Sequence, residues 1–202
     1  SDALRYEIGE ELSRTIEAKD RYTTDLIPVL SVLPSYTQLG MAAMLPHQDL
    51  SILKNGTVQV DGQSASGTEN RAKILAPFNA TAIRSADLLN MSRNESREFT
   101  KNNQIIYIYH NQIDAVGDKR ETEGRVFEAV EDGMDELVEI LKKLTNANLS
   151  NIIITADHGF IYQNRPLDDS EFTSDNIQGD NIFIRNRRFV IGKDLHPSGS
   201  FK

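Results

Sequence analysis

Two short runs decide the fold, Gln104-Ile105-Ile106-Tyr107-Ile108-Tyr109 and Asn151-Ile152-Ile153-Ile154-Thr155. Both are apolar and rich in β-branched or aromatic residues, as are strands buried in a parallel sheet. Between them, apolar residues recur at helical spacing over residues 121–144, which predicts a long helix with one core-facing stripe. A strand, a helix and a second strand in this order predict a crossover, and therefore a parallel sheet covered by helices.

Hydrophobic periodicity predicts further elements along the chain. Apolar residues recur every four positions over residues 3–18, which is the spacing of one helix face. They are Leu4, Ile8, Leu12 and Ile16. Weaker patterns predict the remaining elements, which are a strand over residues 27–33 that ends at Pro34, helices over residues 36–45, 71–75 and 81–89, and a strand over residues 183–191.

Residues 47–68 differ from the rest of the chain because they are rich in Gly, Ser, Asn and Asp. The dipeptides Asn55-Gly56 and Asp61-Gly62 favour the tight turns of β-hairpins. We therefore expect a peripheral insertion at residues 47–68, within a core that spans residues 1–202. The expected architecture is an α/β three-layer sandwich with a mostly parallel central sheet.

The composition limits the chemistry. The 202 residues include no cysteine, so disulfides, thiolate nucleophiles and cysteine-rich zinc sites are excluded, and a cytoplasmic location fits. No stretch approaches the roughly 20 apolar residues of a membrane-spanning helix. The net charge of −8 disfavours non-specific nucleic-acid binding, and it fits either a well-solvated surface or carboxylates reserved for cations. We interpret the chain as a piece of a longer protein, because neither end carries a convincing terminal element.

Polar residues gather where the predicted strands end, and ligands of open α/β sheets bind beyond the carboxyl ends of strands. The residues at such positions are Asp2 before the first helix, Thr37 at the start of a helix, His110, Asn111, Asp114 and Asp118 after the strand at 104–109, and Asp157 and His158 after the strand at 151–155. Taken singly, each also fits a helix cap or a turn residue. Together, carboxylates crowded at one rim would repel one another unless cations neutralised them.

Four motifs of this chain resemble the PglZ domain, a member of the alkaline-phosphatase superfamily. The order and approximate spacing of the motifs match that family, and together they span nearly the whole chain. The motifs are Ser1-Asp2-Ala3-Leu4-Arg5-Tyr6-Glu7, Leu33-Pro34-Ser35-Tyr36-Thr37-Gln38-Leu39-Gly40-Met41-Ala42-Ala43, Tyr109-His110-Asn111-Gln112-Ile113-Asp114-Ala115-Val116-Gly117-Asp118 and Thr155-Ala156-Asp157-His158-Gly159-Phe160.

The resemblance implies roles for individual residues. Asp2 corresponds to the first metal-binding aspartate of the superfamily, at the end of a first strand that the fragment lacks, as it lacks the C-terminal ligand segment. Asp157 and His158 correspond to the Asp-His pair that shares this metal. Thr37 corresponds to the hydroxyl nucleophile, which also touches the metal. A phospho-threonine intermediate is the expected consequence.

A second metal is implied as well. Asp114 corresponds to one of its ligands, and Asp118 stands where many relatives carry His. The remaining ligand, a His near the carboxyl end of the domain, has no clear counterpart, because Pro197 follows His196 where a His-Gly-Gly context is expected. Two divalent cations are expected, with zinc favoured by the ligand set and manganese or magnesium as alternatives.

The implied function is a metal-dependent phosphomonoesterase or phosphodiesterase that acts on phosphoesters such as nucleotides or nucleic acid. Asn111 and Arg5 are candidate contacts for a phosphate oxygen, although their positions favour a turn residue and a solvated helix arginine. The resemblance also implies a cytoplasmic, multi-component setting in bacterial phage defence of the BREX type, with other defence proteins as partners and no membrane. The alternative is a non-catalytic interaction module that keeps the fold and docks to partner proteins.

Overall fold

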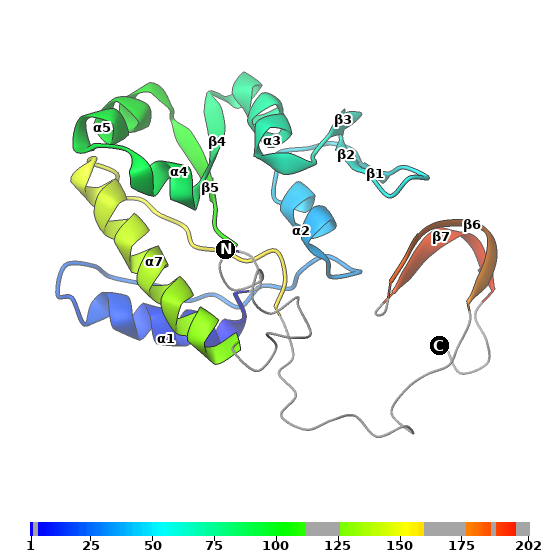
Figure 1. Cartoon of the computed structure of the whole chain (residues 1–202), viewed down its shortest axis with the longest axis horizontal. Coiled ribbons are helices and arrows are strands. Elements are labelled where there is room, and N and C mark those ends of the chain that lie inside the picture. The colour runs from blue at the N-terminus through cyan, green and yellow to red at the C-terminus, as the bar shows by residue number, and fades with distance from the viewer. Residues whose placement is uncertain (2–3, 112–125, 160–176, 187–188, 197–202) are drawn as a thin grey trace.

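The computed structural model of the 202-residue chain describes residues 1, 4–111, 126–159, 177–186 and 189–196, and it shows a mixed α/β protein (Figure 1). No helix within these ranges is both long and apolar enough to cross a membrane. The elements in chain order are α1 (Tyr6–Glu17), α2 (Thr37–Ala43), β1 (Leu50–Ile52), β2 (Val58–Val60), β3 (Gln63–Ser64), α3 (Gly67–Leu75), the 3₁₀ helix η1 (Ala76–Phe78), β4 (Ala80–Arg84), α4 (Ser85–Asn90), α5 (Arg93–Asn102), β5 (Ile105–Tyr109), α7 (Val126–Asn146), β6 (Gln178–Arg185) and β7 (Val190–His196).

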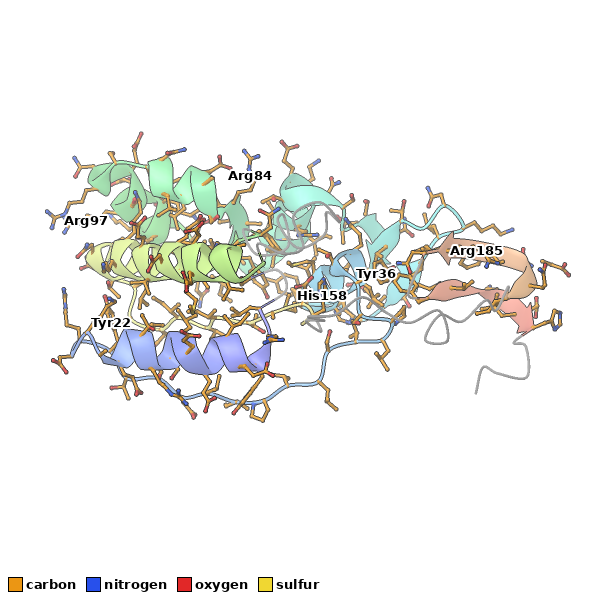
Figure 2. The ribbon with its side chains drawn as sticks, turned by 60° about the horizontal axis from the view of Figure 1, so that its bottom comes forward. Tyr22, Tyr36, Arg84, Arg97, His158 and Arg185 are labelled. Atoms are coloured by element: carbon orange, nitrogen blue, oxygen red, sulfur yellow. The ribbon has the colours of Figure 1, made fainter. Side chains whose placement is uncertain are left out.

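Helices α1 and α7 form one layer and lie side by side in both overall views (Figure 1, Figure 2). As the four-residue spacing predicted, α1 buries Ile8, Leu12 and Ile16. These side chains join the apolar stripe of α7 and Leu88 of α4 in the larger of two core clusters. Ile83, Ile108, Ile152 and Ile154 pack against the same cluster. The helix layer therefore covers β4, β5 and the segment 151–155 together.

Strands β4 and β5 pair in parallel, from Ala80 opposite Ile105 to Arg84 opposite Tyr109. The prediction of a strand at 104–109 is thus confirmed, whereas the predicted helix over residues 81–89 is wrong. Residues 80–84 form a strand because β-branched Thr81 and Ile83 find a hydrogen-bonded neighbour in β5, and the helix α4 begins only at Ser85.

The two other predicted parallel strands, at 27–33 and 151–155, form no ladder within the part of the chain that the structure describes. The long helix is confirmed from Val126 onward, and residues 121–125 lie outside the described ranges. A strand needs a neighbour for its backbone groups, and no backbone hydrogen bond joins these two segments to β4, to β5 or to each other among the described residues. The described parallel sheet therefore has two strands, and the expected large central sheet is not seen.

The segment rich in turn residues forms a small antiparallel sheet of its own, in the order β1-β2-β3. The β1–β2 turn is closed by the Leu53 amide, which donates to the Thr57 carbonyl at 2.9 Å, and Gly56 adopts a left-handed φ of 83° there. The second turn uses Asp61 and Gly62, both with positive φ. Both predicted hairpins are confirmed. This sheet, α2 and α3 share the second core cluster.

The single strand predicted over residues 183–191 is wrong, because the chain reverses inside this range. β6 and β7 are two antiparallel strands. The Asn186 amide donates to the Phe189 carbonyl at 3.0 Å, and the Phe189 amide donates to Asn186 Oδ1 at 2.9 Å. A side-chain cap of this kind closes a tight turn, which hydrophobic periodicity alone does not reveal.

Candidate active site

Thr37 and His158 meet at the start of α2. The Thr37 Oγ1 atom lies 3.1 Å from His158 Nε2, although the two residues are 121 positions apart in the sequence. Thr37 is the first residue of α2, and His158 follows the extended segment 151–157. Figure 2 shows His158 beside Tyr36, the residue that precedes Thr37. The fold thus joins two of the predicted site residues in one hydrogen bond.

The second ring nitrogen of His158 defines the tautomer. His158 Nδ1 lies 2.9 Å from the carbonyl oxygen of Gly159, and a carbonyl can only accept a hydrogen bond. Nδ1 therefore carries a proton and donates it to Gly159. In the neutral ring, Nε2 then has a lone pair directed at Thr37, and the threonine hydroxyl donates to it. An imidazole nitrogen held in this way is ready to accept a proton or to bind a metal ion.

Asp157 adds a carboxylate to the same place. Its Oδ2 atom lies 3.5 Å from His158 Nε2. The Asp157 side chain is 0% exposed and the His158 side chain 6% exposed. Two lone pairs that approach each other away from water are an arrangement that a cation between them would stabilise. The donor set of carboxylate, imidazole and hydroxyl suits zinc or manganese.

Gly40 explains how α2 comes so close to Asp157. A Cβ atom placed on Gly40 would lie 2.7 Å from the Asp157 carbonyl oxygen and 2.8 Å from Asp157 Cβ, so no side chain fits there. The Ser31 hydroxyl also donates a hydrogen bond to the Asp157 carbonyl. The backbone at Asp157 is therefore fixed from two sides, by the helix that carries Thr37 and by the segment that leads into it.

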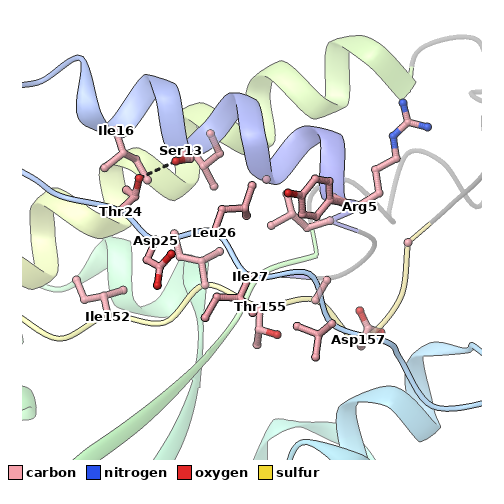
Figure 3. A pocket seen from close by; sticks show the side chains of 18 of the residues that line it. Arg5, Ser13, Ile16, Thr24, Asp25, Leu26, Ile27, Ile152, Thr155 and Asp157 are labelled. Atoms are coloured by element: carbon pink, nitrogen blue, oxygen red, sulfur yellow. Dashed lines mark hydrogen bonds between the residues drawn. The ribbon is translucent and has the colours of Figure 1, made fainter.

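A groove of about 920 Å³ runs beside this cluster, between α1, residues 21–32 and residues 150–159 (Figure 3). Its far end is mixed, with Ser13, Thr24 and Asp25 beside Ile16 and Ile152. Its near end reaches Asp157 and His158. The groove thus reaches the cluster of Thr37, Asp157 and His158 from one side.

Arg5 lies at this end of the groove, but its charged group turns away. The backbone of Arg5 is so close to Gly159 that a Cβ atom on the glycine would lie 3.2 Å from Arg5 Cβ. The Arg5 guanidinium points away from Asp157 (Figure 3), and its Nε atom lies 3.4 Å from a Glu7 carboxylate oxygen. The structure thus brings the Arg5 backbone to the site and directs its side chain elsewhere.

The other predicted site residues either lie outside the described ranges or do not contact Thr37, Asp157 or His158 in a described interaction. Asp2, Asp114 and Asp118 are outside the described ranges. Asn111 is exposed directly after His110. Among the residues that the structure does describe, no group of three or more His, Cys, Asp or Glu side chains converges on one point. The described part of the site consists of Asp157, His158 and the Thr37 hydroxyl.

His110 is a buried group that the sequence did not single out for a role. Its side chain is 1% exposed, with Nδ1 3.0 Å from Ser1 Oγ and Nε2 3.7 Å from Glu136 Oε1. Burial lowers the pKa of His110, and the nearby Glu136 carboxylate raises it in part. The position of a histidine directly after a strand is a usable signal, whereas nothing in the sequence distinguishes Glu136 from the other acidic residues of α7.

Comparison with known proteins shows to which family the chain belongs. The family model for the BREX system PglZ alkaline phosphatase-like domain matches residues 1–200. The chain belongs to the PglZ family. The match confirms the resemblance that the four motifs carried, and it includes Thr37, Asp157 and His158 in one domain.

Two curated PglZ-family relatives are similar over almost the whole chain. The chain is 43% identical over 204 residues to the alkaline phosphatase-like protein BrxZ of Escherichia coli O9:H4 (strain HS), covering 100% of the chain and 24% of the relative. It is 43% identical over 199 residues to the alkaline phosphatase-like protein PglZ of Bacillus cereus (strain H3081.97), covering 96% of the chain and 23% of the relative. The chain therefore spans about a quarter of the length of these relatives. No solved structure gives a significant match.

Proposed function

We propose that this PglZ-family chain is the core of a metal-dependent phosphoesterase in which Thr37 is the nucleophile. The observation that carries the proposal is the contact of 3.1 Å between Thr37 Oγ1 and His158 Nε2, with Asp157 Oδ2 3.5 Å from the same nitrogen. A hydroxyl beside an imidazole and a buried carboxylate is an arrangement that activates an alcohol for attack. The names of the two relatives, both alkaline phosphatase-like, support the same reaction class.

We assign one divalent cation to Asp2, Asp157, His158 and Thr37, and a second to Asp114 and Asp118. Zinc fits the imidazole and carboxylate donors best, and manganese or magnesium suits the more carboxylate-rich second site. Cations bound there would supply positive charge that makes the threonine hydroxyl more acidic and stabilises the oxygens of the phosphoryl group.

The residues of the chain have distinct tasks in the reaction. The Nδ1–H bond to Gly159 fixes the ring of His158, so that Nε2 lies 3.1 Å from the Thr37 hydroxyl and would hold a cation beside it. Thr37 releases its proton to solvent, and Oγ1 forms a bond to phosphorus while the bond from phosphorus to the leaving oxygen breaks. The leaving oxygen keeps the electron pair of that bond and takes up a proton from solvent. Water then attacks the phospho-threonine, which releases phosphate or a phosphomonoester and restores the hydroxyl.

The wider setting follows from the family. We propose a three-layer α/β sandwich with a mostly parallel sheet as the complete architecture, with residues 1–202 as its core and residues 47–68 as a peripheral insertion. Substrates would be phosphoesters such as nucleotides or nucleic acid. Asn111 would contact a phosphate oxygen, and Arg5 would do so after its side chain turns from Glu7 toward the groove. Other phage-defence proteins would be the partners, because the matching domain is described as part of the BREX system, and the location would be cytoplasmic.

A non-catalytic interaction module is the second candidate. It is favoured by Asp118, because a carboxylate at a position where many relatives carry imidazole would weaken a second zinc site. The fold and the first cation would then serve to dock partner proteins. Activity measurements separate the two candidates.

The test is hydrolysis of bis(p-nitrophenyl) phosphate by the full-length protein with zinc or manganese. Thr37→Ala removes the attacking oxygen, so we expect a loss of about 1,000-fold or more in kcat with cation binding retained. Thr37→Ser should keep measurable activity. Ser35→Ala, two residues upstream and exposed, is the matched control and should leave the rate unchanged. Equal rates for Thr37→Ala and the parent protein would reject the nucleophile, and no hydrolysis by the parent protein would favour the interaction module.

A further inference from the structure

Arg71 of α3 is a buried cation. It is 7% exposed, although the guanidinium group of an arginine keeps its charge at any ordinary pH. The Nε–H group donates to the Ala65 carbonyl at 2.9 Å, and the guanidinium carbon lies 4.5 Å from the centre of the Tyr109 ring. The guanidinium is therefore held from two sides, by the loop before α3 and by the last residue of β5.

No carboxylate balances the charge of Arg71 within the described ranges. The ion pairs between described side chains do not include it. Tyr109 does not supply a negative charge either, because burial raises the pKa of its phenol and the charge of Arg71 lowers that pKa only in part. Buried charges in proteins are normally paired, since an unpaired charge is costly to remove from water. Arg71 thus has the burial and the charge of a residue that binds an anion.

Arg84, which lies opposite Tyr109 in the β4–β5 ladder, is the contrasting arginine. Its Nε and one terminal nitrogen donate to the two carboxylate oxygens of Asp87, at 2.7 Å and 3.0 Å, and its side chain is 68% exposed. A charge in water gains little from such a partner, whereas a buried charge needs one. The exposed arginine nevertheless has a carboxylate, and buried Arg71 has none among the described residues. This difference points to a ligand as the counter-charge of Arg71.

The Arg71 side chain lies close to the candidate active site but not in its groove. Tyr109, which holds the guanidinium, is at the carboxyl end of β5. Helix α3 shares the second core cluster with α2, the helix that begins at Thr37. Neither Arg71 nor Tyr109 is among the residues that line the groove at Asp157 and His158. A group bound at Arg71 would therefore lie beside the reacting group and would not take its place.

We propose that Arg71 binds a phosphate group of the substrate other than the phosphate that reacts at Thr37. A guanidinium presents parallel N–H groups that match two oxygens of a phosphate, which makes arginine a preferred partner of this group. Because Ala65 accepts from Nε, the terminal N–H groups are the ones that would meet the phosphate. Preferred substrates would then carry a second phosphate, as oligonucleotides do. The word substrate rests on the proposed phosphoesterase, whereas phosphate binding at Arg71 does not.

Calorimetric titration of the metal-free full-length protein with inorganic phosphate tests the binding. Arg71→Met keeps an unbranched apolar stem and removes the charge, so we expect phosphate affinity to fall about 10-fold or more. Arg84→Met is the matched control and should leave the affinity unchanged, because Asp87 already occupies that guanidinium. Equal affinities of Arg71→Met and the parent protein, or no phosphate binding by the parent protein, would overturn the proposal.

A second variant decides the question if Arg71→Met does not fold. Arg71→Lys keeps the charge of the buried side chain but lacks the planar pair of N–H groups. We expect it to bind phosphate about 5-fold more weakly than the parent protein, because a single ammonium group cannot form two parallel hydrogen bonds to the phosphate. Phosphate binding by Arg71→Lys as tight as in the parent protein would contradict recognition by the guanidinium.

Hydrolysis rates separate this proposal from the proposed function. The substrates are the p-nitrophenyl ester of thymidylate with and without a second phosphate on the sugar, tested with zinc. We expect the parent protein and Arg84→Met to have about 10-fold lower KM for the doubly phosphorylated ester, and Arg71→Lys to lose most of this preference. A parent protein without the preference would overturn the role of Arg71 in substrate binding. Hydrolysis of neither ester, with phosphate still bound through Arg71, would reject the phosphoesterase and support the phosphate site.

Discussion

The β1–β3 sheet and the segment 151–155 are both extended, yet among the described residues only the first forms a ladder. Each strand of the small sheet finds its partner a few residues away, across turns at Gly56 and at Gly62. The segment 151–155 comes after the long helix α7, and the described contacts of Asp157 and His158 that follow it reach residues more than 100 positions away, Ser31 and Thr37. The comparison teaches that local pairing makes the first region complete within this chain, whereas the region that carries Asp157 and His158 depends on sequence far from it.

The largest predicted effect lies in the locally complete region. Leu75 is 1% exposed in the cluster that the small sheet shares with α2 and α3. Leu75→Ala should lower the free energy of unfolding by about 3 kcal/mol, because it removes buried methyl groups and leaves a cavity. Urea denaturation measures the change, and Leu53→Ala, at a site 40% exposed, is the control that should stay within about 0.5 kcal/mol. A loss below about 1 kcal/mol for Leu75→Ala would show that this region is not a fixed core.

The second largest effect is expected where α2 packs against Asp157. Gly40→Ala forces a Cβ atom to within 2.8 Å of Asp157 Cβ, so we expect a loss of about 2 kcal/mol and weaker zinc binding. Gly9→Ala is the matched control in α1, since its nearest contact would be Leu26 Cδ1 at 3.4 Å, and it should be neutral or stabilising. Calorimetric zinc titration and denaturation of both variants provide the measurement. Unchanged affinity and stability in Gly40→Ala would mean that α2 does not fix the backbone at Asp157.

A smaller effect is expected at α5, the second of the two helices between β4 and β5. Ser92 caps α5 by accepting from the Glu95 amide at 3.3 Å, and Glu95 accepts from the Ser92 amide at 2.7 Å. Ser92→Ala should cost about 1 kcal/mol of unfolding free energy. Ser66→Ala is the control, because Ser66 precedes α3 without a side-chain cap bond and should cost less. Equal losses in the two variants would show that the capping box adds nothing here.

The smallest effect is a pH dependence at His110. Burial lowers the pKa of this imidazole from its usual value of 6.5, so the folded protein favours the neutral ring. The unfolded chain therefore binds more protons, and the stability from this group is complete above the ordinary pKa and declines as the pH falls below it. His110→Asn should make the unfolding free energy less pH-dependent between about pH 7 and about pH 5 than in the parent protein. Parallel pH profiles would contradict this assignment.

The sequence predicted elements well where one helix or one turn carries the signal. The four-residue spacing located α1, and the Asn-Gly and Asp-Gly dipeptides located both hairpins. The errors arose where a distant partner decides the outcome, as for Thr81 and Ile83, which became strand only because β5 lies beside them. Helix α5 was overlooked although Ser92 and Glu95 have the spacing of a capping box, because its apolar residues are too few to show periodicity.

The candidate site was predictable to a similar extent. Positions after strands, together with the family resemblance, pointed to Thr37, Asp157 and His158, and the structure places these three together. The predicted contributions of Asp2, Asp114 and Asp118 stay predictions. The packing of Gly40 against Asp157 and the approach of Glu136 to His110 were not predictable, since both depend on how separate elements meet in space.

The central claim is that Thr37, Asp157 and His158 belong to one cation site. Its most direct test is an anomalous-difference map at the zinc edge from crystals of the full-length protein grown with zinc. The claim predicts a peak about 2.0–2.1 Å from His158 Nε2, with an Asp157 oxygen and Thr37 Oγ1 as further ligands. A map with zinc bound elsewhere, and with His158 Nε2 still hydrogen-bonded to the Thr37 hydroxyl, would contradict it.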